Sequence, residues 1–118
     1  MALAPVADLH RAYADDLDGG AVRALLGGTP EEVPERYAAA DTARLLRRRA
    51  VGVVVVHGSA DAHVPIDHSR GLAGGRLVEL PGVEHFALID PQSAAWPHVL
   101  AAIGRSGDAH LLRIASKA

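Results

Sequence analysis

Apolar residues along the chain form short blocks, and three of these blocks have the pattern of β-strands. Residues 51–56 read VGVVVV, a run without polar alternation that is typical of a strand covered on both faces in a parallel sheet. Residues 76–80, RLVEL, predict a second strand, which the Pro81-Gly82 pair ends in a turn. Residues 2–7, ALAPVA, predict a short strand or strand end near the start of the chain.

Apolar residues at helical spacing lie between the strands predicted at 2–7 and 51–56. Val22, Leu25 and Leu26 share one face of a predicted helix, which the following glycine pair ends. Thr29 and Pro30, followed by two glutamates, predict the start of another helix with Thr29 as its N-cap. We therefore expect a helical region, rather than a direct turn, to connect the strand at 2–7 to the strand at 51–56.

The second half of the chain predicts two more helices. A short helix follows Val64-Pro65 and extends to about Leu72. A final helix carries an apolar stripe made of Trp96, Val99, Leu100 and Ile103. The order strand, helices, strand, helix, strand, helix is typical of the α/β class, so we predict an open sheet of about three parallel strands flanked by helices.

Composition and charge limit the size of the protein and the kinds of partner that it binds. With 118 residues, 49% of them hydrophobic, the chain forms at most one small domain. The net charge of -2 provides no basic field for nucleic acid, and we interpret Arg47-Arg48-Arg49 as the solvated end of a helix. The absence of cysteine excludes disulfides and thiolate nucleophiles.

The sequence indicates neither a membrane span nor a secretory signal. Its longest apolar run, residues 50–56, is too short to cross a bilayer. The N-terminal residues MALAPVADL have no basic region before their apolar residues. We therefore expect a cytoplasmic protein that binds neither nucleic acid nor membranes.

An acid and an imidazole follow two consecutive predicted strands. Asp61 comes shortly after the strand at 51–56, and His85 comes shortly after the strand at 76–80. Because the carboxyl ends of parallel strands meet at one edge of a sheet, we expect the two side chains to lie within hydrogen-bonding distance. An aspartate that accepts the Nδ1 proton of a histidine fixes the tautomer and leaves Nε2 to take a proton from a nucleophile.

The segments around these two residues resemble those of the α/β-hydrolase family. HGSADAHVP at 57–65 is similar to the family's acid segment, and GVEHFALIDP at 82–91 is similar to its histidine segment. LGGTPEEVPERYAAAD at 26–41 is similar to the connection before the acid strand in esterase, formamidase-like and prolyl-oligopeptidase-like members. The resemblance implies that Asp61 and His85 are the acid and base of a catalytic triad, without a metal or another cofactor.

The chain departs from this family in lacking the nucleophile. The family's serine lies in a G-x-S-x-G elbow that precedes the acid and the histidine, but none of the serines at 59, 69, 93, 106 and 116 lies in such an elbow. The resemblance therefore implies that residues 1–103 are the C-terminal part of a hydrolase domain, with an unassigned tail at 104–118. The complete enzyme would act on a small-molecule ester or amide, and the chain would pair with an N-terminal half or form a homo-oligomer.

Other interpretations of the same residues stay open. The half-fold could be a non-catalytic interaction module, in which Asp61 only caps a turn and His85 is a structural histidine. A metal-binding domain is a further alternative, built from His57, Asp61, His63 and His68, although their spacing fits no helical i, i+4 pair with a third ligand. Ser59 follows a glycine but lies two residues from Asp61 and outside any strand-to-helix elbow, which argues against a nucleophile there.

Overall fold

The computed structural model describes residues 1–48, 52–72 and 74–104, and these contain one three-stranded parallel sheet. Its strands are β1 (Ala2–Leu3), β2 (Val53–Gly58) and β3 (Gly75–Leu80), in the order β1-β2-β3. Both pairings are parallel, which confirms the α/β class and the three-stranded parallel sheet predicted from the sequence. The carboxyl ends of β2 and β3 are in register, with Gly58 opposite Leu80.

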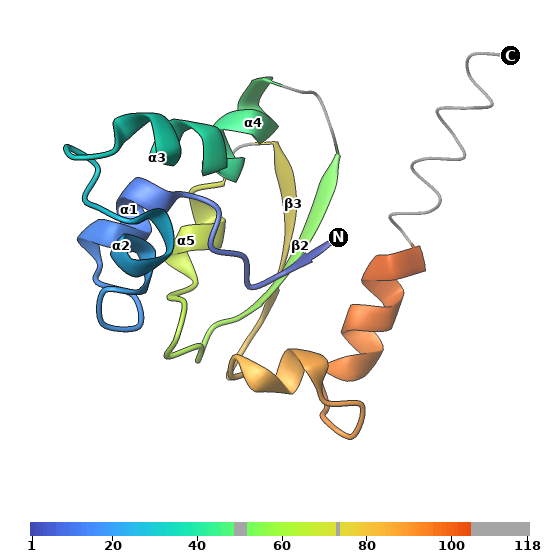
Figure 1. The fold of residues 1–118 in the computed structure, drawn as a ribbon. Helices are drawn as coiled ribbons and strands as arrows, with labels where there is room; N and C mark the ends of the chain where they lie inside the picture. Colours follow the sequence, from blue (N-terminus) through green and yellow to red (C-terminus); the bar gives the residue numbers. More distant parts are fainter. Residues whose placement is uncertain (49–51, 73, 105–118) are drawn as a thin grey trace, which may run out of the picture.

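Helices lie on both sides of this sheet (Figure 1). The connection from β1 to β2 contains α1 (Leu9–Ala14), α2 (Ala21–Leu26), α3 (Pro34–Ala40) and α4 (Thr42–Arg48), and α5 (Asp67–Arg70) connects β2 to β3. These helices lie on one side of the sheet, while the 3-10 helix η1 (Phe86–Ile89) and the helical residues 96–104 lie on the other (Figure 1). No helix in the described parts of the chain has the length and apolar character needed to cross a membrane.

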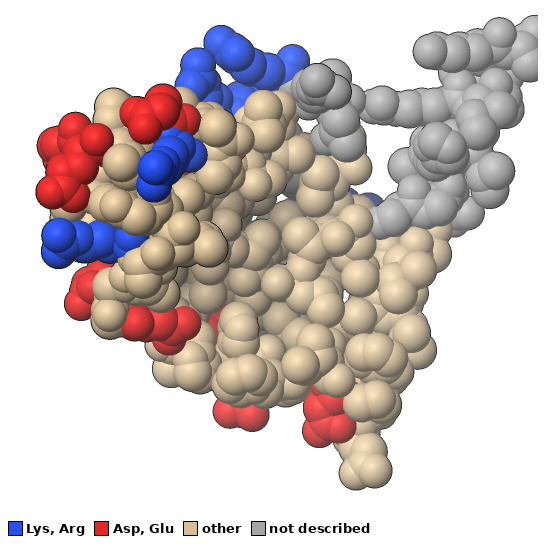
Figure 2. Space-filling view, viewed as in Figure 1, with Lys and Arg blue, Asp and Glu red and all other residues tan. Residues whose placement is uncertain are grey.

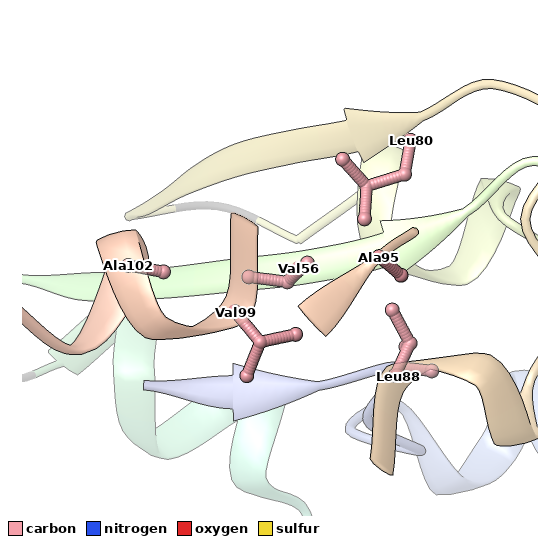
Figure 3. Close-up of a cluster of buried hydrophobic side chains, with 7 residues drawn as sticks. Val56, Leu80, Leu88, Ala95, Val99 and Ala102 are labelled. Carbon is pink, nitrogen blue, oxygen red and sulfur yellow. The ribbon is translucent and has the colours of Figure 1, made fainter. Parts of the chain in front are cut away.

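The core between the sheet and residues 96–104 is made of alanine, valine and leucine side chains (Figure 3). Its buried members are Ala4, Val56, Leu80, Leu88, Ala95, Val99 and Ala102. The predicted stripe is only partly correct, because Val99 is buried and Trp96 packs against the core, whereas Leu100 and Ile103 are 50% and 51% exposed. Ala102 is the buried alanine of this helical segment, and its small side chain allows a close approach to the sheet.

A second buried cluster joins the helices that precede β2. Tyr37 is fully buried there with Val22, Leu9 and Ala12, and its hydroxyl donates to the carbonyl of Gly28 at 3.1 Å. Leu26 packs against this cluster, as its helical spacing from Val22 predicted. Leu25, predicted to share that face, is instead 78% exposed.

The predicted helix start at Thr29 is wrong, because α3 begins at Pro34. Thr29 and Glu32 do form a reciprocal capping pair: the Thr29 N–H donates to Glu32 Oε2 at 2.9 Å, and the Glu32 N–H donates to Thr29 Oγ1 at 3.2 Å. This pair closes a turn rather than a helix. A residue before proline is forced out of the helical region, and Val33 accordingly has φ -134° and ψ 54°.

Other element bounds differ from the prediction by a few residues. β1 contains only Ala2–Leu3, because Ala4 turns to φ 39° before Pro5, although the Ala4 N–H still donates to the Val56 carbonyl at 2.9 Å. β2 begins at Val53 rather than at 51, a position that lies outside the described residues, and α5 ends at Arg70 rather than near Leu72. The unassigned tail at 104–118 lies outside the described residues except for residue 104, which is helical.

Gly58 fixes the distance between the ends of β2 and β3. A Cβ atom at this position would overlap the carbonyl oxygen of Val83 and would lie 2.6 Å from the Val83 carbonyl carbon. The opposing atoms belong to the backbone, so they cannot move aside as a flexible side chain can. Only glycine therefore permits the close approach of the two segments that carry Asp61 and His85.

We predict that Gly58→Ala lowers the free energy of unfolding by about 2 kcal/mol or more, because the added methyl group forces the two backbones apart. Chemical denaturation followed by circular dichroism measures this loss. Gly52→Ala is the matched control, since no atom lies within 4 Å of a Cβ at that position. Equal stability of the two variants would contradict the proposed role of the close approach.

Candidate acid–base site

The loops that follow β2 and β3 are held together by hydrogen bonds. The Ser59 N–H donates to the Leu80 carbonyl at 2.9 Å, and the Ala60 N–H donates to the Val83 carbonyl at 3.0 Å. The Ser59 hydroxyl accepts the N–H of Gly82 at 2.8 Å. These bonds extend the pairing of the two strands beyond the sheet and place the residues that follow in a fixed relation.

The Asp61 carboxylate is the centre of the first loop. Its Oδ1 accepts the backbone N–H groups of His63 at 2.9 Å and Val64 at 2.8 Å. An aspartate that binds N–H groups two and three residues ahead closes a tight turn on its own side chain. The sequence interval from Asp61 to Val64 thus fixes the orientation of the carboxylate and directs Oδ2 away from the turn.

Oδ2 of Asp61 binds the imidazole of His85. The distance from Oδ2 to Nδ1 is 2.6 Å, so the proximity predicted from the two strand ends is confirmed. Because a carboxylate oxygen only accepts, Nδ1 carries the proton, and the neutral ring then has its lone pair on Nε2. Asp61 is buried, whereas the His85 side chain is 28% exposed, and among the described residues none is hydrogen-bonded to Nε2. The catalytic roles assigned to the pair stay predictions.

Opposing effects act on the charge of Asp61. Burial disfavours the carboxylate, but hydrogen bonds from the Val64 N–H, the His85 ring and the His63 N–H outweigh it, so the pKa of Asp61 lies below its ordinary value. Asp61 is therefore an anion at neutral pH and is suited to stabilise a positive charge that develops on His85.

A cluster of three rings lies around the exposed side of His85. The ring centroids of His63 and Phe86 lie 5.3 Å and 5.1 Å from that of His85, and 5.0 Å from each other. A small cavity of about 80 Å³ opens beside them, lined by Leu3, Ala4, His85, Phe86, Leu88 and Ile89. No pattern in the sequence predicted this cluster, since His63 and Phe86 occupy ordinary loop and helix positions.

The four residues of the metal-binding alternative do not converge on one point, although Nε2 of His57 lies 3.3 Å from Oδ2 of Asp61. His57 contacts Ser69, with 2.6 Å between Nδ1 and Oγ, and His68 contacts Asp15, with 2.8 Å between Nε2 and Oδ2. In the part of the chain that the structure describes, no group of three or more His, Asp or Glu side chains is arranged to hold a metal ion. The fold thus keeps His57 and Asp61 together, whereas His68 pairs with Asp15 instead.

The serines within the described ranges are all engaged elsewhere. Besides the bond from Gly82 to Ser59, the Ser69 hydroxyl contacts His57, and the Ser93 hydroxyl donates to the Ala87 carbonyl at 2.6 Å. None of these three hydroxyls is hydrogen-bonded to His85. The serines at 106 and 116 lie outside the described residues. Among the described residues, the site thus pairs a carboxylate with an imidazole, and no serine hydroxyl is bonded to that imidazole.

Comparison with known proteins adds no family to this description. The chain matches no protein-family model, and no curated protein shows significant sequence similarity to it.

We predict that Asp61→Asn lowers the melting temperature at pH 7, because replacing a buried carboxylate that accepts three hydrogen bonds costs about 1–3 kcal/mol. A lowered carboxyl pKa stabilises the folded state above the ordinary value of about 3.9, and this stabilisation is lost as the pH falls through the lower folded-state value. Stability should therefore fall less steeply below about pH 4 in the variant than in the natural chain.

Thermal unfolding between pH 3 and pH 7 measures both effects. Asp16→Asn, which replaces an exposed carboxylate at φ 49°, is the matched control and should keep the slope of the natural chain. Identical pH profiles for the natural chain and Asp61→Asn would show that the Asp61 charge does not stabilise the fold.

Proposed function

We propose that the chain supplies the acid and the base of a serine hydrolase of the α/β-hydrolase type, which acts on ester or amide bonds. The observation that carries this proposal is the 2.6 Å bond between Asp61 and His85 at neighbouring strand ends, with Nε2 of His85 left unbonded among the described residues. The nucleophilic serine would come from a polypeptide segment outside these 118 residues.

The geometry supports a two-stage acyl transfer. Nε2 of His85 would take the proton from the serine hydroxyl as its oxygen attacks the substrate carbonyl, and would then pass that proton to the departing alcohol or amine. Water would then attack the acyl-enzyme and lose its proton to the same nitrogen, which returns the proton to the serine oxygen as the acid is released. Asp61 would hold the ring and stabilise the imidazolium in both stages.

The surroundings of His85 support a complementing segment. β1 has a neighbour on one side only within the described sheet, so its other edge offers free backbone groups for a further strand. Phe86 and Ile89 are 56% and 63% exposed beside this edge, and they line the small cavity with Leu3. A segment that covered them would bring its own residues next to Nε2 of His85.

Labelling with a fluorophosphonate probe tests the proposal. We predict that the purified chain is not labelled, because an imidazole without a nucleophile and an oxyanion hole loses most of the rate enhancement. Co-expression with the segment encoded beside it that contains a G-x-S-x-G serine should produce labelling of that serine. His85→Gln should slow this labelling at least about 100-fold.

His98→Gln is the matched control, because His98 is exposed on the helical segment 96–104 and should leave the labelling rate unchanged. Labelling of the chain by itself would reveal a nucleophile within it and contradict the split site. A complex that is labelled equally fast with His85→Gln, or the absence of any such serine segment in the source genome, would contradict the hydrolase proposal.

A second candidate function is a non-catalytic interaction module, favoured by apolar side chains on the side of the sheet that carries η1. Phe86, Ile89, Leu100 and Ile103 are each at least half exposed there. In the view of Figure 2, most charged side chains gather over α2, α3 and α4, whereas the part formed by η1 and residues 96–104 is largely uncharged. Exposed apolar surface of this kind favours association with a partner or a second copy.

We predict that the purified chain is oligomeric, aggregated or only partly folded at micromolar concentration, as sedimentation velocity would show. The double variant Ile89→Lys, Ile103→Lys should shift it toward the monomer, whereas Leu25→Lys, at a 78% exposed position on α2, should not. A sharp monomer peak for the natural chain, with cooperative thermal unfolding, would contradict both the association and the half-fold interpretation. Association without serine labelling in any complex would favour the interaction module over the hydrolase.

A further inference from the structure

We propose that His57 is a positioning residue, which holds the Asp61 turn through the carbonyl of Val64 and is itself oriented by Ser69. A continuous series of hydrogen bonds carries this inference from α5 to the acid–base pair. The meaning of the arrangement for catalysis rests on the proposed hydrolase function, but the arrangement itself is tested without any catalysis.

The series begins on α5 and ends at His85. The Ser69 hydroxyl lies 2.6 Å from Nδ1 of His57, and Nε2 of His57 lies 2.8 Å from the carbonyl oxygen of Val64. The N–H of the same Val64 donates to Oδ1 of Asp61 at 2.8 Å, and Oδ2 of Asp61 accepts from His85 at 2.6 Å. Val64 thus connects the buried His57 ring to the Asp61 carboxylate, with its carbonyl oxygen bonded to the ring and its N–H bonded to the carboxylate.

The neighbours of His57 define its tautomer. Nε2 faces the Val64 carbonyl at 2.8 Å and Oδ2 of Asp61 at 3.3 Å, and both of these oxygens only accept hydrogen bonds. Nε2 therefore carries a proton in every charge state of the ring. In the neutral ring Nδ1 must accept, so the Ser69 hydroxyl donates to it. Ser69 thereby favours the one neutral tautomer that can hold Val64.

Burial makes these partners important for His57. Its side chain is fully buried at the end of β2, directly after a run of valines that packs without any polar partner. An imidazole in such a place is costly unless both nitrogens are hydrogen-bonded, and the structure provides a partner for each. Nε2 of His57 contacts two oxygens of the turn that carries Asp61, the Val64 carbonyl oxygen and Asp61 Oδ2, and so restrains that turn.

Loss of the Nε2 donor should therefore loosen the carboxylate. Without it the Val64 carbonyl loses its buried partner, and the turn can rotate so that the Val64 N–H leaves Oδ1. Asp61 would then keep the His63 N–H as its backbone donor, and Oδ2 would no longer be held against Nδ1 of His85. The backbone amide of Val64 and the ring proton of His85 report these two steps separately.

Nuclear magnetic resonance of the full chain labelled with ¹⁵N tests this inference. In His57→Gln the side-chain amide can donate to Val64 in place of Nε2, whereas in His57→Phe a ring of similar size has no donor. We expect His57→Gln to retain the low-field resonance of the His85 Nδ1 proton and the slow exchange of the Val64 amide. His57→Phe should lose that resonance and exchange the Val64 amide at least about tenfold faster.

Ser69→Ala supplies a milder variant that should fold even if His57→Phe does not. Without the Ser69 hydroxyl, Nδ1 of His57 loses its hydrogen-bond donor, so its ¹⁵N shift should change, and the Val64 amide should exchange faster than in the natural chain. Retention of the His85 resonance and of Val64 protection in a folded His57→Phe chain would overturn the proposal. Unchanged ¹⁵N shifts of His57 in Ser69→Ala would also overturn it. The same holds if His57→Gln and His57→Phe lose the His85 resonance and the Val64 protection to the same extent.

The outcome does not depend on a nucleophile, so it is separable from the hydrolase proposal. The probe experiment on the co-expressed complex can fail while the resonances behave as expected, which would leave His57 as a positioning residue of a non-catalytic pair. Conversely, serine labelling that depends on His85 but not on His57 would support the hydrolase proposal and contradict the positioning role of His57.

Discussion

The described site depends on the hydrogen bonds that the Asp61 carboxylate accepts. A buried charge is unfavourable unless donors surround it, and here two backbone N–H groups bind one oxygen while an imidazole binds the other. The same bonds that stabilise the charge also close the turn and orient the ring. Charge, loop conformation and histidine tautomer are thus set together, and a change in one of them alters the other two.

The sequence predicted the strands better than the helices. A continuous valine run and a second strand bounded by turns are local signals, and both predicted strands are present in a parallel sheet. The helix start at Thr29 failed because its capping signal was followed by Val33-Pro34, a pair that interrupts helical backbone. The exposed faces of Leu25 and Leu100 could not be predicted, since helical spacing defines a face but not which element covers it.

Asp61 and His85 could be placed from the sequence because each follows the end of a strand, and parallel strands bring such ends together. The side chains that surround Asp61 and His85 could not be predicted from the sequence in this way. His57 joins Ser69 across the β2–α5 connection, and His63 meets Phe86 across the two strand-end loops. Such contacts depend on the path of the chain in three dimensions. The histidines of the metal alternative therefore looked like one group in the sequence but have separate partners in the fold.

The pairing of the strands has a consequence for the order of folding. Val53 pairs with Gly75 across the short α5 connection, whereas Ala2 pairs with Val55 across all of α1 to α4. Closing the shorter loop costs less chain entropy, so we expect β2, α5 and β3 to associate first and β1 to dock late. The acid and the base both lie on or next to this early unit. Pulse-labelled hydrogen exchange that protected β1 before β3 would refute this order.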